Sequence, residues 1–275
     1  MMSASGLSIF ADTLAELTAD EVSDAARAGA VALWAFGVIE QHGPHLPTGT
    51  DVYLPAAKLR LTKEKLAARG INALIVPAYY WGVNHVSGSF PASFRVRPAV
   101  MAELMSDVIE SLAGDGFRHL FCISGHGDAL HNRTILEGIR KGVAVASIDA
   151  SFLAPTRIVT RLGFAADDPQ VTTFEPKPVG PARPYVDVHA GEGETSEMLA
   201  SYPGLVREPL LPGLVPTNFV QADLEEWRKG LEHAKRKTPL GYLGDPAASD
   251  VAVGERSLHA TAEAMADAIA ARIAR

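Results

Sequence analysis

Four acidic and imidazole side chains cluster in one short stretch of the sequence, immediately after an apolar run. The run covers residues 31–39, and Glu40, His42, His45 and Asp51 follow it within twelve positions. In an extended chain, residues two apart point to the same side, so Glu40 and His42 can face one point as the strand ends. The glycines and prolines of residues 43–49 can turn the chain so that Asp51 also reaches that point. Carboxylates mixed with imidazoles favour Zn, Mn or Fe over Ca or Mg, which prefer shells of oxygen ligands.

A simpler interpretation of these residues is also open. Polar residues gather in loops for many reasons, and Thr50 or Asp51 could cap the helix that we expect to follow without binding anything.

Another histidine follows a second apolar run. The run covers residues 119–124, and His126 lies after it between Gly125 and Gly127, which permit a tight turn. The segment is not a dinucleotide-binding loop, because no G-x-G-x-x-G follows the strand. It is not a nucleophile elbow either, because Ser124 lacks the G-x-S-x-G frame. His126 therefore adds a candidate metal ligand at a second strand end.

Two further segments carry residues that could act on a substrate. His189 precedes Glu192 and Glu194 at a glycine-rich turn, although acids at a helix start also serve as ordinary dipole partners. Residues 78–94 are aperiodic and aromatic, and they include Trp81 and His85. Loops of this kind commonly form the rim of active sites in open α/β sheets, although His85 could equally be a plain loop residue.

The apolar runs and their periodicity predict alternating strands and helices. We expect strands at residues 31–39, 73–77, 119–124 and 143–149. We expect helices at residues 13–30, 52–69, 98–113, 131–141, 223–237 and 260–275, with a further one starting near 194–196. The proline-rich stretch within residues 150–185 predicts an irregular lid or a subunit contact, and residues 223–237 predict an exposed, charged helix.

Composition narrows the class of protein. The 275 residues suit one large domain, and a hydrophobic content of 47% is enough to fill its core. A net charge of −7 argues against nucleic acid or an anionic membrane as a partner. Neither a membrane span nor a signal peptide is expected. The single Cys122, within an apolar run, predicts a packed core thiol in a cytoplasmic protein.

Taken together, these motifs resemble those of a known family. Residues 40–51 read E-Q-H-G-P-H-L-P-T-G-T-D and resemble the E-x-H-G-x-H-L-P-x-x-T-D signature of the creatininase (creatinine amidohydrolase) family. Residues 124–127, 189–196 and 85–93 are similar to its N-G-H, H-A-G-x-x-E-T-S and H-x-x-F-P-G-T motifs. The motifs lie in the family's order and cover residues 31–200. No motif covers residues 203–275, which we expect to pack as an extension on the same domain or on a neighbouring subunit.

The resemblance implies a three-layer α/β/α fold with a mostly parallel central sheet. It also implies two divalent metal ions per subunit and hydrolysis of a non-peptide C–N bond in a cyclic amide or formamide. It implies that Glu40 and His126 bind one ion, that His42 binds the other and that Asp51 bridges them. The further acid of the family falls on Asp128. The two ions would lower the pKa of a water between them toward about 7, so that hydroxide attacks a carbonyl.

Further roles follow from the resemblance. His189, with Glu192 and Glu194 nearby, would pass a proton to the leaving nitrogen. We expect His45, Trp81 and His85 to contact a small-molecule substrate. The resemblance also implies a homo-oligomer, usually a hexamer.

Three departures from the family pattern affect substrate choice. Ser124 replaces Asn, Asp128 is shorter than Glu, and residues 92–93 read Ala-Ser in place of Gly-Thr. Two alternatives therefore stay open. One is C–C hydrolysis of a cyclic diketone, or cleavage of a peptide precursor, at the same site. The other is a metal-binding module without catalysis.

Overall fold

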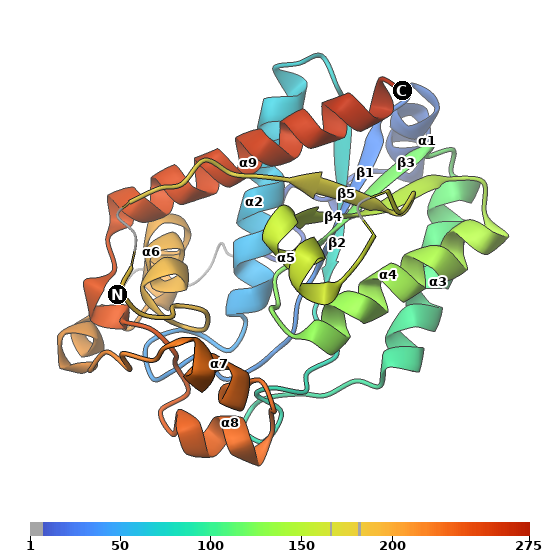
Figure 1. The fold of residues 1–275 in the computed structure, drawn as a ribbon. Coiled ribbons are helices and arrows are strands. Elements are labelled where there is room, and N and C mark those ends of the chain that lie inside the picture. Colours follow the sequence, from blue (N-terminus) through green and yellow to red (C-terminus); the bar gives the residue numbers. More distant parts are fainter. Residues whose placement is uncertain (1–7, 166, 181–182) are drawn as a thin grey trace.

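The fold is built on a five-stranded parallel sheet. The computed structural model describes residues 8–165, 167–180 and 183–275. Within them the strands lie in the order β2-β1-β3-β4-β5, and every pairing is parallel (Figure 1). The strands are β1 Val31–Phe36, β2 Ala73–Tyr79, β3 His119–Ser124, β4 Asp149–Pro155 and β5 Val171–Phe174.

Helices cover both faces of this sheet, which confirms the predicted three-layer α/β/α fold (Figure 1). In chain order they are α1 Ala19–Arg27, α2 Thr50–Ala67, α3 Pro98–Gly114, α4 Ala129–Val145, α5 Thr156–Leu162, α6 Glu192–Ser201, α7 Gln221–Trp227, α8 Glu232–Lys237 and α9 Val251–Ile273. Right-handed crossovers explain the layers, because β1 connects to β2 in one direction along the sheet while β3 and β4 follow in the other. Helix α2 thus covers one face, and α3 and α4 cover the other.

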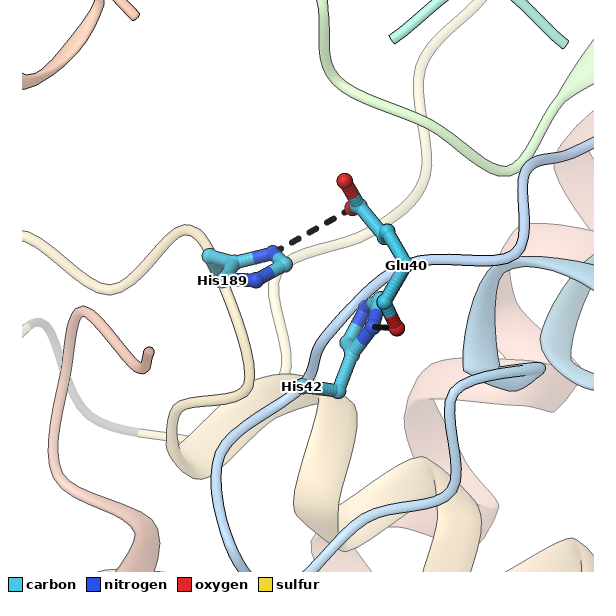
Figure 2. A group of neighbouring side chains, drawn as sticks. All are labelled: Glu40, His42 and His189. Atoms are coloured by element: carbon cyan, nitrogen blue, oxygen red, sulfur yellow. Dashed lines mark hydrogen bonds and ion pairs between the residues drawn. The ribbon is translucent and has the colours of Figure 1, made fainter. Parts of the chain in front are cut away.

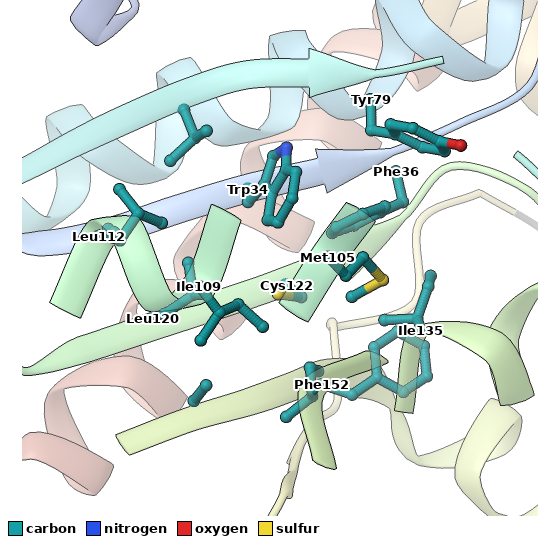
Figure 3. Packing of buried hydrophobic residues seen from close by; sticks show 14 of the residues in the cluster. Trp34, Phe36, Tyr79, Met105, Ile109, Leu112, Leu120, Cys122, Ile135 and Phe152 are labelled. Atoms are coloured by element: carbon teal, nitrogen blue, oxygen red, sulfur yellow. The ribbon is translucent and has the colours of Figure 1, made fainter. Parts of the chain in front are cut away.

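Strand residues alternate between two separate cores. Trp34, Cys122 and Phe152 point toward α3 and α4, where Met105 and Ile135 complete the packing (Figure 3). Because both faces are covered, the strands read as continuous apolar runs rather than as alternating ones. The packing confirms that Cys122 is a buried core thiol.

The opposite core joins the sheet to α2 and to the C-terminal helix. Leu33 and Phe121 pack there against Leu59 of α2 and against Met265 and Ile269 of α9. Helix α9 lies across this face of the sheet and also packs on α6 (Figure 1). Residues beyond 203 therefore contribute to the same core as the motif-bearing part of the chain.

The predicted fourth strand at residues 143–149 is wrong. Residues 143–145 continue α4, and β4 begins only at Asp149. The Val-Ala-Val sequence suits either structure locally. Packing decides between them, because Gly138 and Gly142 let α4 lie tightly against Met105 and Ile109 of α3.

The expectation of irregular structure across residues 150–185 is also wrong in part, since β4, α5 and β5 lie there. Residues 166 and 181–182 of that stretch lie outside the described residues. The single exposed helix expected at 223–237 is two helices, α7 and α8. Gly230 and Leu231 separate them in a left-handed backbone conformation, with φ of 75° and 49°. Leu224 and Trp227 of α7 are buried, so that helix is not simply a solvated face.

Across the described residues, no helix is both long and apolar enough to cross a membrane.

Candidate active site

The candidate ligands meet where the strand order reverses. Chain connections leave β1 toward β2 on one side and reach β3 on the other, so the carboxyl ends of β1 and β3 form the switch point of the sheet. Ligands of open α/β sheets bind at such a point. Glu40 follows β1 and His126 follows β3. A hydrogen bond from the Gly125 N–H to the Phe36 carbonyl, 2.8 Å long, holds the two strand ends together.

Asp51 reaches the switch point through the first turn of α2. Gly49 occupies the N-cap of that helix without a side-chain capping bond, so the capping interpretation of Thr50 or Asp51 is wrong. Pro55 has no N–H to bond to the Asp51 carbonyl, and that carbonyl lies against Gly37 and Gly125 instead. A Cβ at either glycine would be only 2.2 Å from the carbonyl oxygen, so glycine at both strand ends lets α2 approach this closely.

The Asp51 carboxylate lies between two groups of ligand atoms. Its Oδ2 is 2.9 Å from Nδ1 of His126, and that nitrogen is 3.1 Å from Oε1 of Glu40. Its Oδ1 is 3.2 Å from Nε2 of His42, which is 3.7 Å from Oε2 of Glu194. Three overlapping groups have ligand atoms close enough to hold one cation, and Asp51 belongs to two of them. The groups are Glu40–Asp51–His126, His42–Asp51–Glu194 and Glu40–His42–His189.

The hydrogen bonds of the histidines assign their tautomers. In the neutral ring, His42 Nδ1 donates to the Glu40 carbonyl, 3.2 Å away (Figure 2). Its Nε2 then carries a lone pair on the side of Asp51 and Glu194. His189 Nε2 donates to the Gln41 carbonyl at 2.9 Å, so its Nδ1 faces Glu40 Oε1 at 3.6 Å (Figure 2). A ring whose second nitrogen is held by a carbonyl is typical of a metal-binding histidine.

The carboxylates of this cluster favour the binding of protons or cations. Burial opposes protonation of His42, but Asp51, Glu194 and Glu40 outweigh it and raise its pKa to about 10. The pKa of His126 is raised well above its usual value against the same burial, by Glu40 and Asp51. Burial alone would raise the pKa of the Asp51 carboxyl, yet the two imidazoles hold it well below its ordinary range. Three carboxylates thus share a buried site that attracts protons or cations.

Buried polar atoms without hydrogen bonds give a further reason to expect divalent cations at this site. Glu40 Oε1, His42 Nε2 and Asp51 Oδ2 are buried, and among the described residues none makes a hydrogen bond of acceptable geometry, although each lies within 3.2 Å of another candidate ligand atom. Buried polar atoms are nearly always paired, so three unpaired ligand atoms facing one centre indicate a bound group. Their mixed oxygen and nitrogen chemistry matches Zn, Mn or Fe.

Sequence reasoning missed the residues that orient Glu40. Asn84 Nδ2 donates to Glu40 Oε2 at 2.9 Å, and the Ser87 hydroxyl donates to the same oxygen. Both side chains are buried, and Asn84 also bonds Ser87 at 2.9 Å. They lie in the aperiodic segment between β2 and α3, where the only sequence signal was a polar residue on either side of His85.

The two other predicted catalytic acids lie in different surroundings. Glu194 Oε2 accepts the Ala190 N–H at 2.6 Å and faces His42, and burial raises the pKa of its carboxyl to about 7. Glu192, in contrast, binds Arg183 at 2.6 Å and the Tyr185 hydroxyl at 2.9 Å. The structure therefore brings Glu194 into the cluster and places Glu192 outside it.

Asp128, predicted as a metal ligand, has both carboxylate oxygens engaged by the backbone. Oδ2 accepts the His85 and Val86 N–H groups at 2.8 and 2.9 Å, and Oδ1 accepts the Leu130 N–H at 2.7 Å. The first two bonds anchor the 78–94 segment, and the third caps α4. Asp128 is absent from the candidate cation groups found among the described residues.

A cavity of about 900 Å³ opens over the cluster. His85 lines it, as do Phe174 and the cluster residues Glu40, Asp51 and His189. Trp81 and His45, predicted to contact substrate, do not. Trp81 packs on Tyr80 and Phe94 with 43% of its surface exposed. His45 is buried, with Nε2 2.9 Å from the Thr195 hydroxyl. Trp227 of α7 packs on the His189 ring and covers the site from the C-terminal half.

Comparison with known proteins points in one direction. A family model described as creatinine amidohydrolase matches residues 15–269. The creatinine amidohydrolase of Pseudomonas putida is 28% identical over 263 residues, covering 92% of this chain and 94% of that protein. The mycofactocin precursor peptide peptidase of Mycolicibacterium smegmatis is 28% identical over 235 residues, covering 85% of this chain and 81% of that protein.

The likeness extends to solved structures. A manganese form of creatininase superimposes with a TM-score of 0.70 at 25% identity, and the match covers 95% of this chain and 98% of that one.

Proposed function

Because this chain belongs to the creatininase family and is a metal-dependent hydrolase, we propose that it hydrolyses a non-peptide C–N bond in a small molecule. The bond is that of an amide, a cyclic amide or a formamide, and two divalent ions, Zn, Mn or Fe, take part. The observation that carries the proposal is the position of Asp51, whose two oxygens face two separate groups of ligand atoms. One carboxylate between two such groups is suited to a two-metal centre.

Each ligand has a defined place in this proposal. Glu40 and His126 would hold one ion and His42 and Glu194 the other, with the Asp51 carboxylate shared between the two groups. When bound, the ions would polarise the substrate carbonyl and lower the pKa of a water. Ser87 and Asn84 fix Glu40, so that its free oxygen stays directed at the centre.

His189 is suited to move a proton. Its Nε2 is held by the Gln41 carbonyl, so Nδ1 alone is available toward Glu40 and the cavity. We assign Nδ1 to accept a proton from the attacking water and to deliver it to the leaving nitrogen. Acid–base assistance of this kind contributes roughly 10²–10⁴ in rate.

Metal analysis of purified protein tests the centre. We expect about two ions per chain, and the variant Asp51→Asn should lose both together with all hydrolysis, because it removes charge from both groups. Asp115→Asn, an exposed position at the end of α3, serves as the matched control and should change neither. Protein that holds only trace metal, and whose behaviour is indifferent to chelators, would overturn the proposal.

A second candidate function keeps the metals and changes the substrate. The peptidase relative is as similar in identity as the amidohydrolase, and a cavity of about 900 Å³ lies near the upper end for small-molecule sites, roughly 300–1,000 Å³. A substrate panel of creatinine, a formamidopyrimidine, a keto-inositol and a mycofactocin precursor peptide separates the alternatives. Turnover of only the peptide or only the diketone would replace C–N hydrolysis of a small amide. Binding without turnover by metal-loaded protein would favour a non-catalytic module.

Assembly and location stay predictions. We propose a cytoplasmic homo-oligomer, a hexamer by family resemblance, which light scattering coupled to size-exclusion chromatography measures directly.

A further inference from the structure

Four arginines line the cavity that contains the candidate metal centre, and three of them form no ion pair among the described residues. Arg157 and Arg161 belong to α5, which follows β4, and Arg228 lies at the C-terminal end of α7. Arg157 and Arg161 are four residues apart, so they share one face of their helix. Helices from separate parts of the chain thus bring three guanidinium groups to one cavity, in a protein whose net charge is −7.

Carboxylates act on these arginines only from beyond ion-pair distance, Asp128 on Arg161 and Glu225 on Arg228. Among the described residues, none of the three forms an ion pair, whereas two other cations of the same cavity do. Arg183 binds Glu192 at 2.6 Å, and Lys58 binds Glu197 at 2.8 Å. Like charges four apart on a helix are destabilising, so the pair on α5 opposes folding unless something else binds it.

Arg161 lies close enough to the other two arginines for their charges to act on it. Burial, followed by the positive charges of Arg228 and Arg157, lowers the pKa of the Arg161 guanidinium. Burial likewise lowers the pKa of Arg228. Arg161 also reaches the metal-binding loop, because its Nη2 donates to the Gly127 carbonyl at 2.8 Å, one residue after His126. The cluster therefore adjoins the centre and does not lie on a remote surface.

We propose that Arg157, Arg161 and Arg228 bind an anionic group of the substrate, a carboxylate or a phosphate, while its scissile bond lies at the Glu40–Asp51–His126 group of the same cavity. This inference rests on the proposed function and names the class of substrate. The planar guanidinium fork matches both carboxylate and phosphate oxygens, often through two parallel bonds. An anion at the three arginines would also remove the repulsion that their positions create.

Binding of simple anions tests the site without catalysis. The probes are inorganic phosphate and succinate, titrated calorimetrically into the full chain at low ionic strength, once stripped of metal and once loaded with Mn. We expect at least one probe to bind, and the stronger of the two identifies the anion. Arg157→Gln and Arg228→Gln should each weaken that binding about tenfold, because each removes charged hydrogen bonds.

Matched variants separate anion binding at these three arginines from nonspecific attraction of anions to positive charge. Arg118→Gln removes the same charge at an exposed position outside the cavity and should leave binding unchanged. Arg228→Lys should retain part of the binding, since it keeps the charge but loses the fork. Neither Arg157 nor Arg228 makes a side-chain hydrogen bond within the described residues, so their variants should melt at the wild-type temperature. Absence of binding by both probes, or equal weakening by Arg118→Gln, would overturn the proposal.

Turnover distinguishes this inference from the proposed function. With Mn-loaded enzyme, N-formylglycine should have a lower KM than the uncharged N-formylglycinamide, and Arg228→Gln should abolish that difference. If the enzyme hydrolyses neither formamide, the titrations still decide whether the anion site exists. Hydrolysis of both with the same KM, together with no anion binding, would overturn the inference and leave the hydrolase intact.

Discussion

At the scale of single residues, the site depends on which of two oxygens each carboxylate has free. Asn84 and Ser87 occupy Oε2 of Glu40, which leaves Oε1 directed at His126 and His189. Hydrogen-bond partners of this kind orient the candidate ligands before any metal binds, so part of the ordering cost of metal binding is met on folding.

The Ser87 hydroxyl offers the first test. Ser87→Ala should lower metal affinity about 10–100-fold, because Glu40 loses a bond that fixes its orientation. Competition with a chromophoric chelator measures the change. Ser89→Ala deletes a hydroxyl from the same segment without touching Glu40 and should bind metal normally. Equal affinity in both variants would show that Ser87 does not orient the ligand.

Asp128 offers a second test at this scale, because its backbone bonds and its place in the motif suggest different roles. If it anchors the 78–94 segment and caps α4, Asp128→Ala should cost about 1–2 kcal/mol in the free energy of unfolding, as loss of a cap does. Metal content should then stay close to that of the wild type. Denaturant unfolding and metal analysis of the same sample give both values. A direct ligand would instead show loss of an ion.

The sequence predicted the candidate metal ligands but not the residues that hold them in place. Glu40, His42 and His126 are visible because each comes directly after an apolar run, where parallel strands end. Asn84 and Ser87 are 44 and 47 residues from Glu40 along the chain and lie in a segment without period. Nothing local links them to it. Their role follows only from tertiary contact.

At the scale of helices and strands, predictions are again limited by what the local sequence pattern can show. The strand at residues 119–124 was predicted with the bounds that the structure has, because it is apolar and bounded by turn residues. The strand at 143–149 was misplaced, because Val143 and Val145 satisfy a strand pattern that close packing of α3 and α4 overrides. Strand β5 was missed, since its four residues are too few for a period to show.

That packing can be tested at Gly142. A Cβ there would lie 2.7 Å from three side-chain atoms of Ile109, so Gly142→Ala should destabilise the fold by about 1–3 kcal/mol through overpacking. The better helix propensity of alanine, about 1 kcal/mol, offsets part of this loss. Gly114→Ala, at the end of α3 with no atom within 4 Å of its Cβ, should stabilise slightly. Chemical denaturation compares the two, and a stabilised Gly142→Ala would contradict the packing argument.

At the scale of the whole molecule, the C-terminal helix closes the structure over the motif-bearing part of the chain. Met265 and Ile269 of α9 fill the core beneath the sheet, and Gly254 lets the start of the helix approach the Ser196 carbonyl of α6. No motif predicted this role for residues beyond 203, because amphipathic alanine-rich helices pack on many surfaces. The far end of α9 is held by charge.

Arg272, near the C-terminal end of α9, forms an ion pair with Asp149. The stability of the protein at acid pH therefore tests whether this ion pair holds the helix in place. Arg272 Nε donates to Oδ2 of Asp149 at 3.0 Å, and His119 Nδ1 lies 3.3 Å from the same oxygen. Although burial opposes it, Arg272, with His119, lowers the pKa of the Asp149 carboxyl below its ordinary value of 3.8. A depressed carboxyl pKa stabilises the fold above the unfolded value, and the stabilisation is lost as pH falls through the folded value.

We therefore expect Arg272→Gln to unfold more easily than the wild type at pH 5–7, with the difference shrinking as the pH falls below about 4. Because the Asp149 side chain is 38% exposed, solvent screening limits the difference to at most about 1 kcal/mol. Arg275→Gln removes a charge from the same end of the chain and should show no such dependence. Denaturant melts at a series of pH values measure it. A difference that persists unchanged to pH 2.5 would mean that Arg272 holds α9 through the Pro169 carbonyl and Thr172 alone.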